Sequence, residues 1–223
     1  GPSIRTCDIK DENSIKNLIR DLKPNLVINA AGTFYESPIE LPQICINEKI
    51  HYVDIADDRA YVSNFTSKFD LPAKKAGIVM RTSASTTLAL SSAVIEEFSS
   101  EFSSLKHVDI AMSPGNRLPR GVDTIASVLS HSGKKFYRPC RGKQVELIGW
   151  RGLRNVDFMG MGSRLVGQID VPDLEMIPKH YDVEDGVEFR AGLELRVLQL
   201  FVSGVSTFMP WFRLEQFVSL ITQ

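Results

Sequence analysis

The 223-residue sequence predicts an α/β fold, with a parallel sheet in its first half and an α+β region after it. From residue 4 to residue 98, short apolar runs alternate with segments of helical periodicity, which is typical of a parallel sheet joined by helices. A Ser-rich stretch, residues 99–104, then ends this alternation, and long Gly- and Pro-containing segments separate the later strands. We therefore expect one domain over residues 1–98 and a second over residues 99–223.

In the first half, one helical face carries Ile15, Leu18, Ile19 and Leu22. Pro24 prevents that helix from continuing. Residues 26–29 are apolar on both faces, as in a buried parallel strand. The full set of expected strands is 4–9, 26–29, 51–55 and 77–81. The expected helices are 11–22, one starting at Ser37 or near Leu41 and ending by Lys49, 59–69 (a helix or an irregular lid), and one capped at Thr86 or Thr87 and running to Phe98.

In the second half the expected strands are 106–112, 144–150 and 187–190, and a helix is expected over 121–132. Residues 194–221 are expected to form two helices broken at Pro210. Residues 197–212 carry no charge, but this run is shorter than the roughly 20 residues that span a bilayer. A buried or subunit-interface helix fits it, and so does a membrane-surface helix anchored by Trp211 and Phe212, which would place a peripheral membrane contact in residues 197–221.

The charge distribution argues against nucleic acid as a partner, because the formal net charge is −1. The charges are uneven along the chain. Residues 131–155 carry seven Lys or Arg against Glu146, and residues 170–188 carry seven acids against Lys179. We expect these two segments to complement each other within the fold or a dimer rather than to bind a polymer.

Three cysteines without CxxC spacing, Cys7, Cys45 and Cys140, indicate a reducing compartment and no zinc site, so we expect a cytoplasmic protein without a metal. The first three residues, Gly-Pro-Ser, are typical of a cloning remnant.

Three polar segments follow strands of the first half. Small residues, Ala30 to Gly32, end the strand 26–29 and either let a ligand lie on the backbone or form a plain tight turn. Asp54 ends the next strand on the same sheet edge, where it orients a ligand hydroxyl or amine or caps the following segment. Hydroxyls at residues 82–86 precede a helix; either the backbone N–H groups at its start meet an anion or a polarised carbonyl, or the hydroxyls only cap the helix. The sequence contains no GxGxxG.

The segments VINAAGTF (27–34), CINEKIHYVDIADDRAYVSNF (45–65) and SASTTLALSSAVIEEF (83–98), in this order and spacing, resemble the saccharopine dehydrogenase-like oxidoreductases. SPGNRLPRG (113–121) and VEFRAGLEL (187–195) resemble one branch of that family. The resemblance implies a homodimeric enzyme that uses NADP or NAD and a small-molecule substrate. It also implies a Rossmann domain followed by a substrate and dimerisation domain.

The sequence departs from this family at its start, because the first βαβ unit with GxGxxG is missing. The resemblance therefore implies a truncated Rossmann-type sheet, and we expect this chain alone to be inactive. Thr33 also stands where the family tends to have Pro.

The resemblance implies site residues of two kinds. The cofactor-binding residues are Ala30, Ala31, Gly32 and Thr33 for the ribose and phosphates, and Asp54, Ser83 and Ser85 near the nicotinamide. Arg117 and Arg120 either bind a substrate carboxylate or are surface arginines. No catalytic acid or base is identified.

Two other interpretations remain beside the dehydrogenase. The chain is a non-enzymatic family member that acts as a dimerising or membrane-associated scaffold, or it is an epimerase-like protein. The second is weaker, because no Tyr in the sequence has a Lys four residues later.

Overall fold

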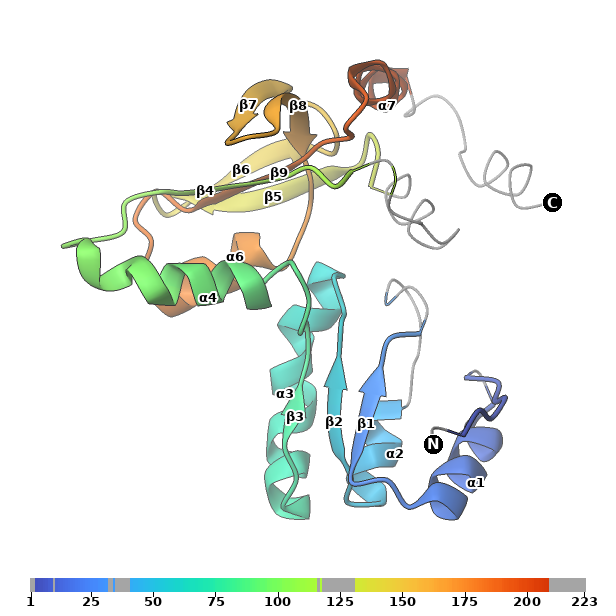
Figure 1. Ribbon diagram of the computed structural model, residues 1–223. Coiled ribbons are helices and arrows are strands. Elements are labelled where there is room, and N and C mark those ends of the chain that lie inside the picture. Colours follow the sequence, from blue (N-terminus) through green and yellow to red (C-terminus); the bar gives the residue numbers. More distant parts are fainter. Residues whose placement is uncertain are drawn as a thin grey trace. The chain divides into compact units, whose positions relative to one another are not determined.

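The computed structural model describes residues 3–9, 11–31, 34, 41–115, 117 and 131–208 (Figure 1). These residues form a mixed α/β protein with one parallel and one mixed sheet, as the sequence predicts. The chain divides into two compact units, Gly1–Leu90 (unit 1) and Ser91–Gln223 (unit 2). The division lies at the start of α4 (Ala89–Phe98), whereas the sequence places a domain boundary at the end of that helix.

Unit 1 contains a three-stranded parallel sheet in the order β1 (Leu26–Asn29), β2 (His51–Asp54), β3 (Met80–Arg81). The helices α1 (Glu12–Leu22), α2 (Leu41–Asn47) and α3 (Arg59–Ala76) alternate with the strands. Their ends follow local chemistry: the side chains of Asp11 and Asp58 cap the first turns of α1 and α3, and Gly77 ends α3 at a φ of 71°. With α4 following β3, the predicted alternation of strands and helices is confirmed for the described residues between 11 and 98.

Helix α3 is longer than expected and continues past Phe69 to Ala76, with Pro72 inside it. Phe65, Phe69 and Ala73 lie on its buried face at helical spacing, so packing on the core sustains the extra turns although Pro72 donates no backbone hydrogen bond.

The two faces of the unit 1 sheet differ. On one face, Val27, Tyr52 and Met80 form a cross-strand row that packs in a core with residues of all three helices. On the other face, Leu26 is 48% exposed and Ile28 is 67% exposed. Parallel strands are normally covered on both faces. One face of this sheet is therefore largely exposed in the part of unit 1 that the structure describes.

The prediction of a strand at residues 4–9 is wrong. The described residues 3–9 form no strand, and Ile4 is 91% exposed while Cys7 and Ile9 only partly pack on the core. A strand needs a neighbour to satisfy its backbone groups. Among the described residues β1 pairs with β2 alone, so residues 4–9 have no strand beside them.

Unit 2 contains a four-stranded sheet and a separate hairpin. The sheet order is β4 (Val108–Met112), β9 (Val187–Ala191), β8 (Gly162–Gln168), β7 (Arg154–Phe158), with β4 and β9 parallel and the other pairs antiparallel. The hairpin consists of β5 (Lys135–Cys140) and β6 (Lys143–Ile148), joined by Arg141 and Gly142, both at positive φ. The helical elements are η1 (Ser99–Glu101), α6 (Asp173–Tyr181) and α7 (Arg196–Phe208).

The expected strands at 106–112, 144–150 and 187–190 correspond to β4, β6 and β9, while β5, β7, β8 and α6 were not predicted. Most of the expected helix 121–132 lies outside the described residues, and so do Pro210 and the second tail helix. Within the described part of the chain, no helix is both long and apolar enough to cross a membrane.

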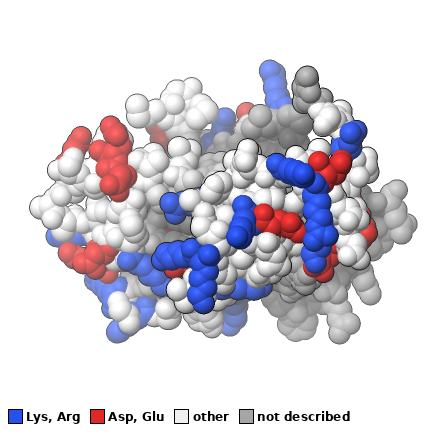
Figure 2. Space-filling view, turned by 90° about the horizontal axis from the view of Figure 1, so that it is seen from below, with Lys and Arg blue, Asp and Glu red and all other residues white. Residues whose placement is uncertain are grey.

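The basic and acidic segments of unit 2 pair with each other, which confirms that prediction. Arg138 and Arg141 of the basic segment form ion pairs with Glu188 and Asp185 of the acidic segment, at 2.7 and 2.6 Å. On the face shown in Figure 2, Lys and Arg side chains lie among Asp and Glu side chains.

Candidate functional site

The carboxyl ends of the unit 1 strands bring polar side chains together. Asn29 ends β1, Asp54 ends β2 directly beside it, and Thr82 follows β3. Asn29 and Asp54 are both buried, and Asp54 is completely so. Buried polar side chains need hydrogen-bond partners inside the protein, so we expect Asp54 to bond to neighbouring groups at this edge of the sheet.

The Asp54 carboxylate accepts four hydrogen bonds from its own chain. Its Oδ1 accepts from the backbone N–H groups of Ala56 and Ser83, at 3.1 and 2.9 Å, and from the Thr82 hydroxyl at 2.8 Å. Its Oδ2 accepts from the Tyr61 hydroxyl at 3.1 Å. One carboxylate thus joins the end of β2, the start of α3 and the turn after β3, and it fixes the position of that turn.

Two tyrosines connect Asp54 to Asn29. The Asn29 amide donates to the Tyr52 hydroxyl at 3.1 Å, Tyr52 donates to Tyr61, and Tyr61 donates to Asp54. Burial, followed by the charge of Asp54, raises the pKa of Tyr61 above its ordinary value. Burial also raises the pKa of Tyr52, with Tyr61 and Asp54 adding to it. Both phenols therefore stay neutral and act as hydrogen-bond donors.

The turn between β3 and α4 is strained and rich in hydroxyls. Ser83 and Leu88 have φ values of 58° and 57°, a region that non-glycine residues rarely adopt. The Ser83 N–H is held by Asp54, but its Oγ is buried without a hydrogen-bond partner. An orphaned hydroxyl in a strained turn at the carboxyl edge of a parallel sheet is a feature of binding sites.

The cofactor residues implied by the family resemblance occupy different environments. Ala30 and Ala31 are exposed just after β1, and the Ala31 N–H donates to the Asn29 side chain at 3.1 Å. Ser83 lies beside Asp54, whereas the half-buried Ser85 bonds to Thr87 instead. Gly32 and Thr33 lie outside the described residues.

Among these residues, Asp54 has a structural role that its contacts define. Since its carboxylate is buried and engaged by its own chain, it holds the Thr82–Ser83 turn in place. A direct contact between Asp54 and a cofactor stays a prediction.

In unit 2, Arg117 is exposed, and Arg120 lies outside the described residues. The structure adds residues that sequence reasoning missed, above all Asn29, Tyr52 and Tyr61. Asn29 was detectable as a polar residue at the end of an apolar strand. The two tyrosines carried no sequence signal, because both resemble ordinary core residues.

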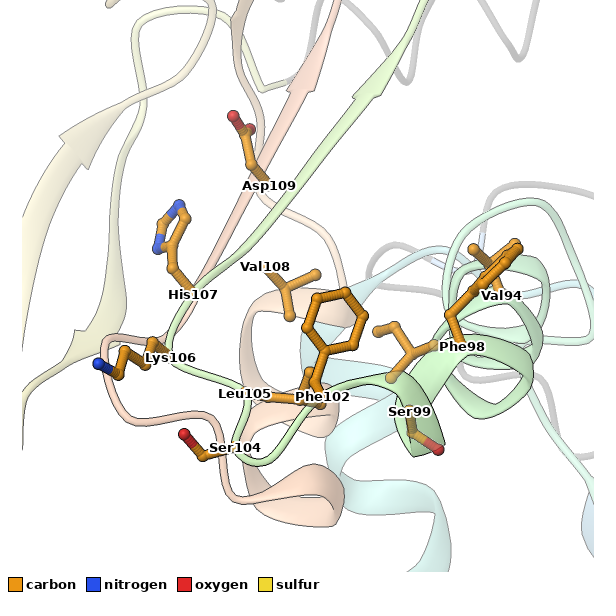
Figure 3. Close-up of a pocket in the computed structure, with 11 residues that line it drawn as sticks. Val94, Phe98, Ser99, Phe102, Ser104, Leu105, Lys106, His107, Val108 and Asp109 are labelled. Atoms are coloured by element: carbon orange, nitrogen blue, oxygen red, sulfur yellow. The ribbon is translucent and has the colours of Figure 1, made fainter.

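Unit 2 also contains an apolar groove of about 550 Å³ between α4 and β4. Phe102, Leu105 and Val108 line it from one side and Val94 and Phe98 from α4, as Figure 3 shows. Lys106 and His107 point away from this apolar cluster. The groove therefore offers mainly apolar contacts.

Among the described residues, no group of His, Cys, Asp or Glu side chains is arranged to hold a metal ion. Comparison of the chain with models of known protein families finds no match, and comparison with curated proteins finds none either.

Proposed function

We propose that this chain carries the second half of a Rossmann dinucleotide-binding domain and the substrate and dimerisation domain of a saccharopine dehydrogenase-like NAD(P)-dependent oxidoreductase. In the full-length protein, hydride passes to or from a C–N (imine or amine) or related carbon of a small molecule. The chain alone is inactive in this proposal, because its sequence contains no GxGxxG turn to hold a pyrophosphate.

The observation that carries the proposal is the carboxyl edge of the β1–β2–β3 sheet. Ligands of open parallel sheets bind outside the carboxyl ends of the strands. Ala30 and Ala31 are exposed there, and their methyl side chains leave the backbone open to a ribose or phosphate. The position of Ala31 is fixed through Asn29, and the Asn29 amide belongs to the same hydrogen-bonded network as Asp54.

The uncovered sheet face supports the second element of the proposal, a missing βαβ unit. Ile28 and Leu26 lie on that face, and the outer edge of β1 has no strand beside it among the described residues. A βαβ unit would supply a parallel strand at this edge and a helix over the exposed apolar side chains. It would also explain why residues 4–9, which have strand-like sequence, form no strand here.

In this proposal the chain's own residues would bind and orient the cofactor and the substrate. A bound nicotinamide supplies the hydride chemistry. Asp54 positions the turn with Ser83, whose hydroxyl is buried without a hydrogen-bond partner. Arg117 is exposed and is a candidate for a substrate carboxylate.

Calorimetric titration with NADH and NADPH tests this proposal directly. We would compare the present chain with a version extended by a GxGxxG βαβ unit at its N-terminus. Binding by the extended form alone supports the proposal. If neither form binds at millimolar concentrations of cofactor, the dehydrogenase interpretation fails.

One observation favours the scaffold as a second candidate. Helix α7 exposes Val197 and Phe201, at 77% and 66%, while Gln199 and Val202 on the same helix are buried. An exposed apolar face suits a second copy or a membrane surface. Sedimentation with liposomes distinguishes a second copy from a membrane surface. If the protein forms a defined dimer and stays in the supernatant, membrane association of the scaffold is excluded.

A further inference from the structure

Two arginines share one glutamate where the β5–β6 hairpin meets β9 in unit 2. Arg138 of β5 donates through Nη2 to Oε1 of Glu188 at 2.7 Å. Arg190, two residues after Glu188 on β9, donates through Nη1 to its Oε2, also at 2.7 Å, and its Nη2 lies at the same distance from that oxygen. Glu188 is thus held from both sides by guanidinium groups.

The three side chains of this cluster, two arginines and one glutamate, carry a net positive charge. Arg138 and Arg190 are both buried, and Glu188 is the only carboxylate within ion-pair distance of either among the described residues. The nearest other carboxylates have cations of their own: Asp185 pairs with Arg141, and Asp109, the cross-strand neighbour of Glu188, pairs with Arg154. An uncompensated buried charge is costly, so an anion that entered here would be bound favourably.

The cluster also has unused hydrogen-bond donors. A guanidinium group has five N–H donors. The described contacts use two on Arg190 and two on Arg138, where the second is a long bond of 3.5 Å to the backbone oxygen of Asp185. The Nε atoms of both arginines are buried without any partner. Buried donors of this kind are rare in folded proteins unless a ligand or a water satisfies them.

We propose that Arg138 and Arg190 bind a small oxyanion, a carboxylate or a phosphate group, beside Glu188. The fork of guanidinium donors matches the oxygen geometry of both groups. The side chains of Arg138, Arg190 and Glu188 are 10%, 9% and 19% exposed, so the cluster suits one small group rather than a polymer. This site lies wholly within unit 2 and does not depend on the cofactor proposed for unit 1.

Nuclear magnetic resonance of the arginine side chains tests the proposal on the unaltered protein. The Nε–H signals of Arg138 and Arg190 would be followed while malonate or phosphate replaces chloride at constant ionic strength. We expect saturable shifts of both signals with at least one oxyanion, and the oxyanion that saturates identifies the ligand class. The Nε–H of Arg141, which donates to Asp185, serves as an internal reference. If the Arg138 and Arg190 signals move no more than that reference, the proposal is wrong.

Two variants with opposite expected effects complete the test. Arg190→Met should weaken oxyanion binding by about tenfold to a hundredfold, because one charged hydrogen-bonding group is lost. Glu188→Gln should strengthen it, because the competing carboxylate charge is removed. Lys143→Met removes an exposed positive charge from the same hairpin and is the matched control, with binding close to that of the unaltered protein. Unchanged binding in Arg190→Met, or weaker binding in Glu188→Gln, would overturn the proposal.

Discussion

Asp54 in unit 1 and Glu188 in unit 2 are both acidic side chains on parallel-paired strands, but their hydrogen-bond balance is opposite. Asp54 accepts from four donors of its own chain, all of them neutral. Glu188 accepts from two cations that keep further donors unused. The closed network around Asp54 fixes a loop in position, whereas the surplus charge beside Glu188 is suited to binding an anion.

Asp54→Ala should have the largest effect on stability. It leaves four donors without their acceptor, and each buried donor left in this way costs about 1–3 kcal/mol, so we expect a loss of about 3–5 kcal/mol after relaxation. Urea denaturation measures this loss. Asp70→Ala is the matched control, because Asp70 forms an exposed pair with Lys74 one helical turn away, worth about 0.5 kcal/mol or less. Similar losses in the two variants would contradict the role given to Asp54.

Gly186→Ala should break the Arg138–Glu188 contact by displacing the hairpin. Gly186 has a φ of 83°, and a Cβ there would lie 2.2 Å from the Pro139 backbone oxygen of β5. We expect a loss of about 2–4 kcal/mol, from backbone strain and overpacking together. Gly77→Ala provides the comparison, since its φ is 71° but a Cβ there has open space, so only the strain of about 1 kcal/mol remains. Equal losses by urea denaturation would show that the close approach to β5 does not matter.

Tyr61→Phe should open the closed network of unit 1 at one point. The change removes the donor to Asp54 and leaves the Tyr52 hydroxyl without its acceptor, which should cost about 1–2 kcal/mol. Tyr137→Phe removes an exposed hydroxyl that donates to Glu146 and should cost about 0.5 kcal/mol or less. Urea denaturation of the two variants measures both losses in the free energy of unfolding. A larger loss in Tyr137→Phe than in Tyr61→Phe would contradict the account.

Because Cys45 is buried in the core of unit 1, we expect stability to depend on pH. Burial raises the pKa of the Cys45 thiol from 9.0 to about 12. Because the folded-state pKa is raised, this contribution is complete below pH 9 and is lost as the pH rises toward 12, by about 1.4 kcal/mol per unit. Denaturation at pH 9 and pH 10 should therefore show a smaller decline in a Cys45→Ala variant than in the unaltered protein. An equal decline would argue that Cys45 is accessible to water.

Arg190→Met should have the smallest effect on stability, about 0–1 kcal/mol in either direction without oxyanion. It leaves the neutral Arg138–Glu188 pair in place and removes a surplus buried charge, and exchanges of this kind are often neutral or stabilising. Urea denaturation in chloride alone measures it. A loss as large as that of Asp54→Ala would mean that Arg190 serves chiefly to hold the fold.

The sequence predicted unit 1 better than unit 2 because the elements of unit 1 are set by local patterns. The spacing of Ile15 and Ile19 and the caps at Asp11 and Asp58 are sufficient for the helices. The strand at 4–9 failed because a strand also needs a neighbour. In unit 2, β5 contains Pro139 and α6 contains Pro178, so local rules argued against both, and pairing with β6 and packing in unit 2 overrode them.

The position of the candidate site was predictable from the sequence, but its hydrogen-bond partners were not. Asp54 at a strand end indicated the polar edge of the sheet. Its partners Tyr61 and Thr82 follow 7 and 28 residues later, and only the folded backbone brings them to one carboxylate. The orphaned donors of Arg138 and Arg190 had no sequence signal, because a basic residue in a charged segment is ordinarily solvated or paired.

The most direct test of the central claim is a fluorescence titration with NADPH and NADH of the chain extended by a GxGxxG βαβ unit, with and without Ala31→Arg. Ala31 is exposed at the end of β1, so a long side chain there should obstruct the backbone without unfolding the sheet. The account predicts saturable binding by the extended chain and a loss of about tenfold or more in affinity with Ala31→Arg. Equal affinity of the two proteins would contradict the placement of a dinucleotide at this edge.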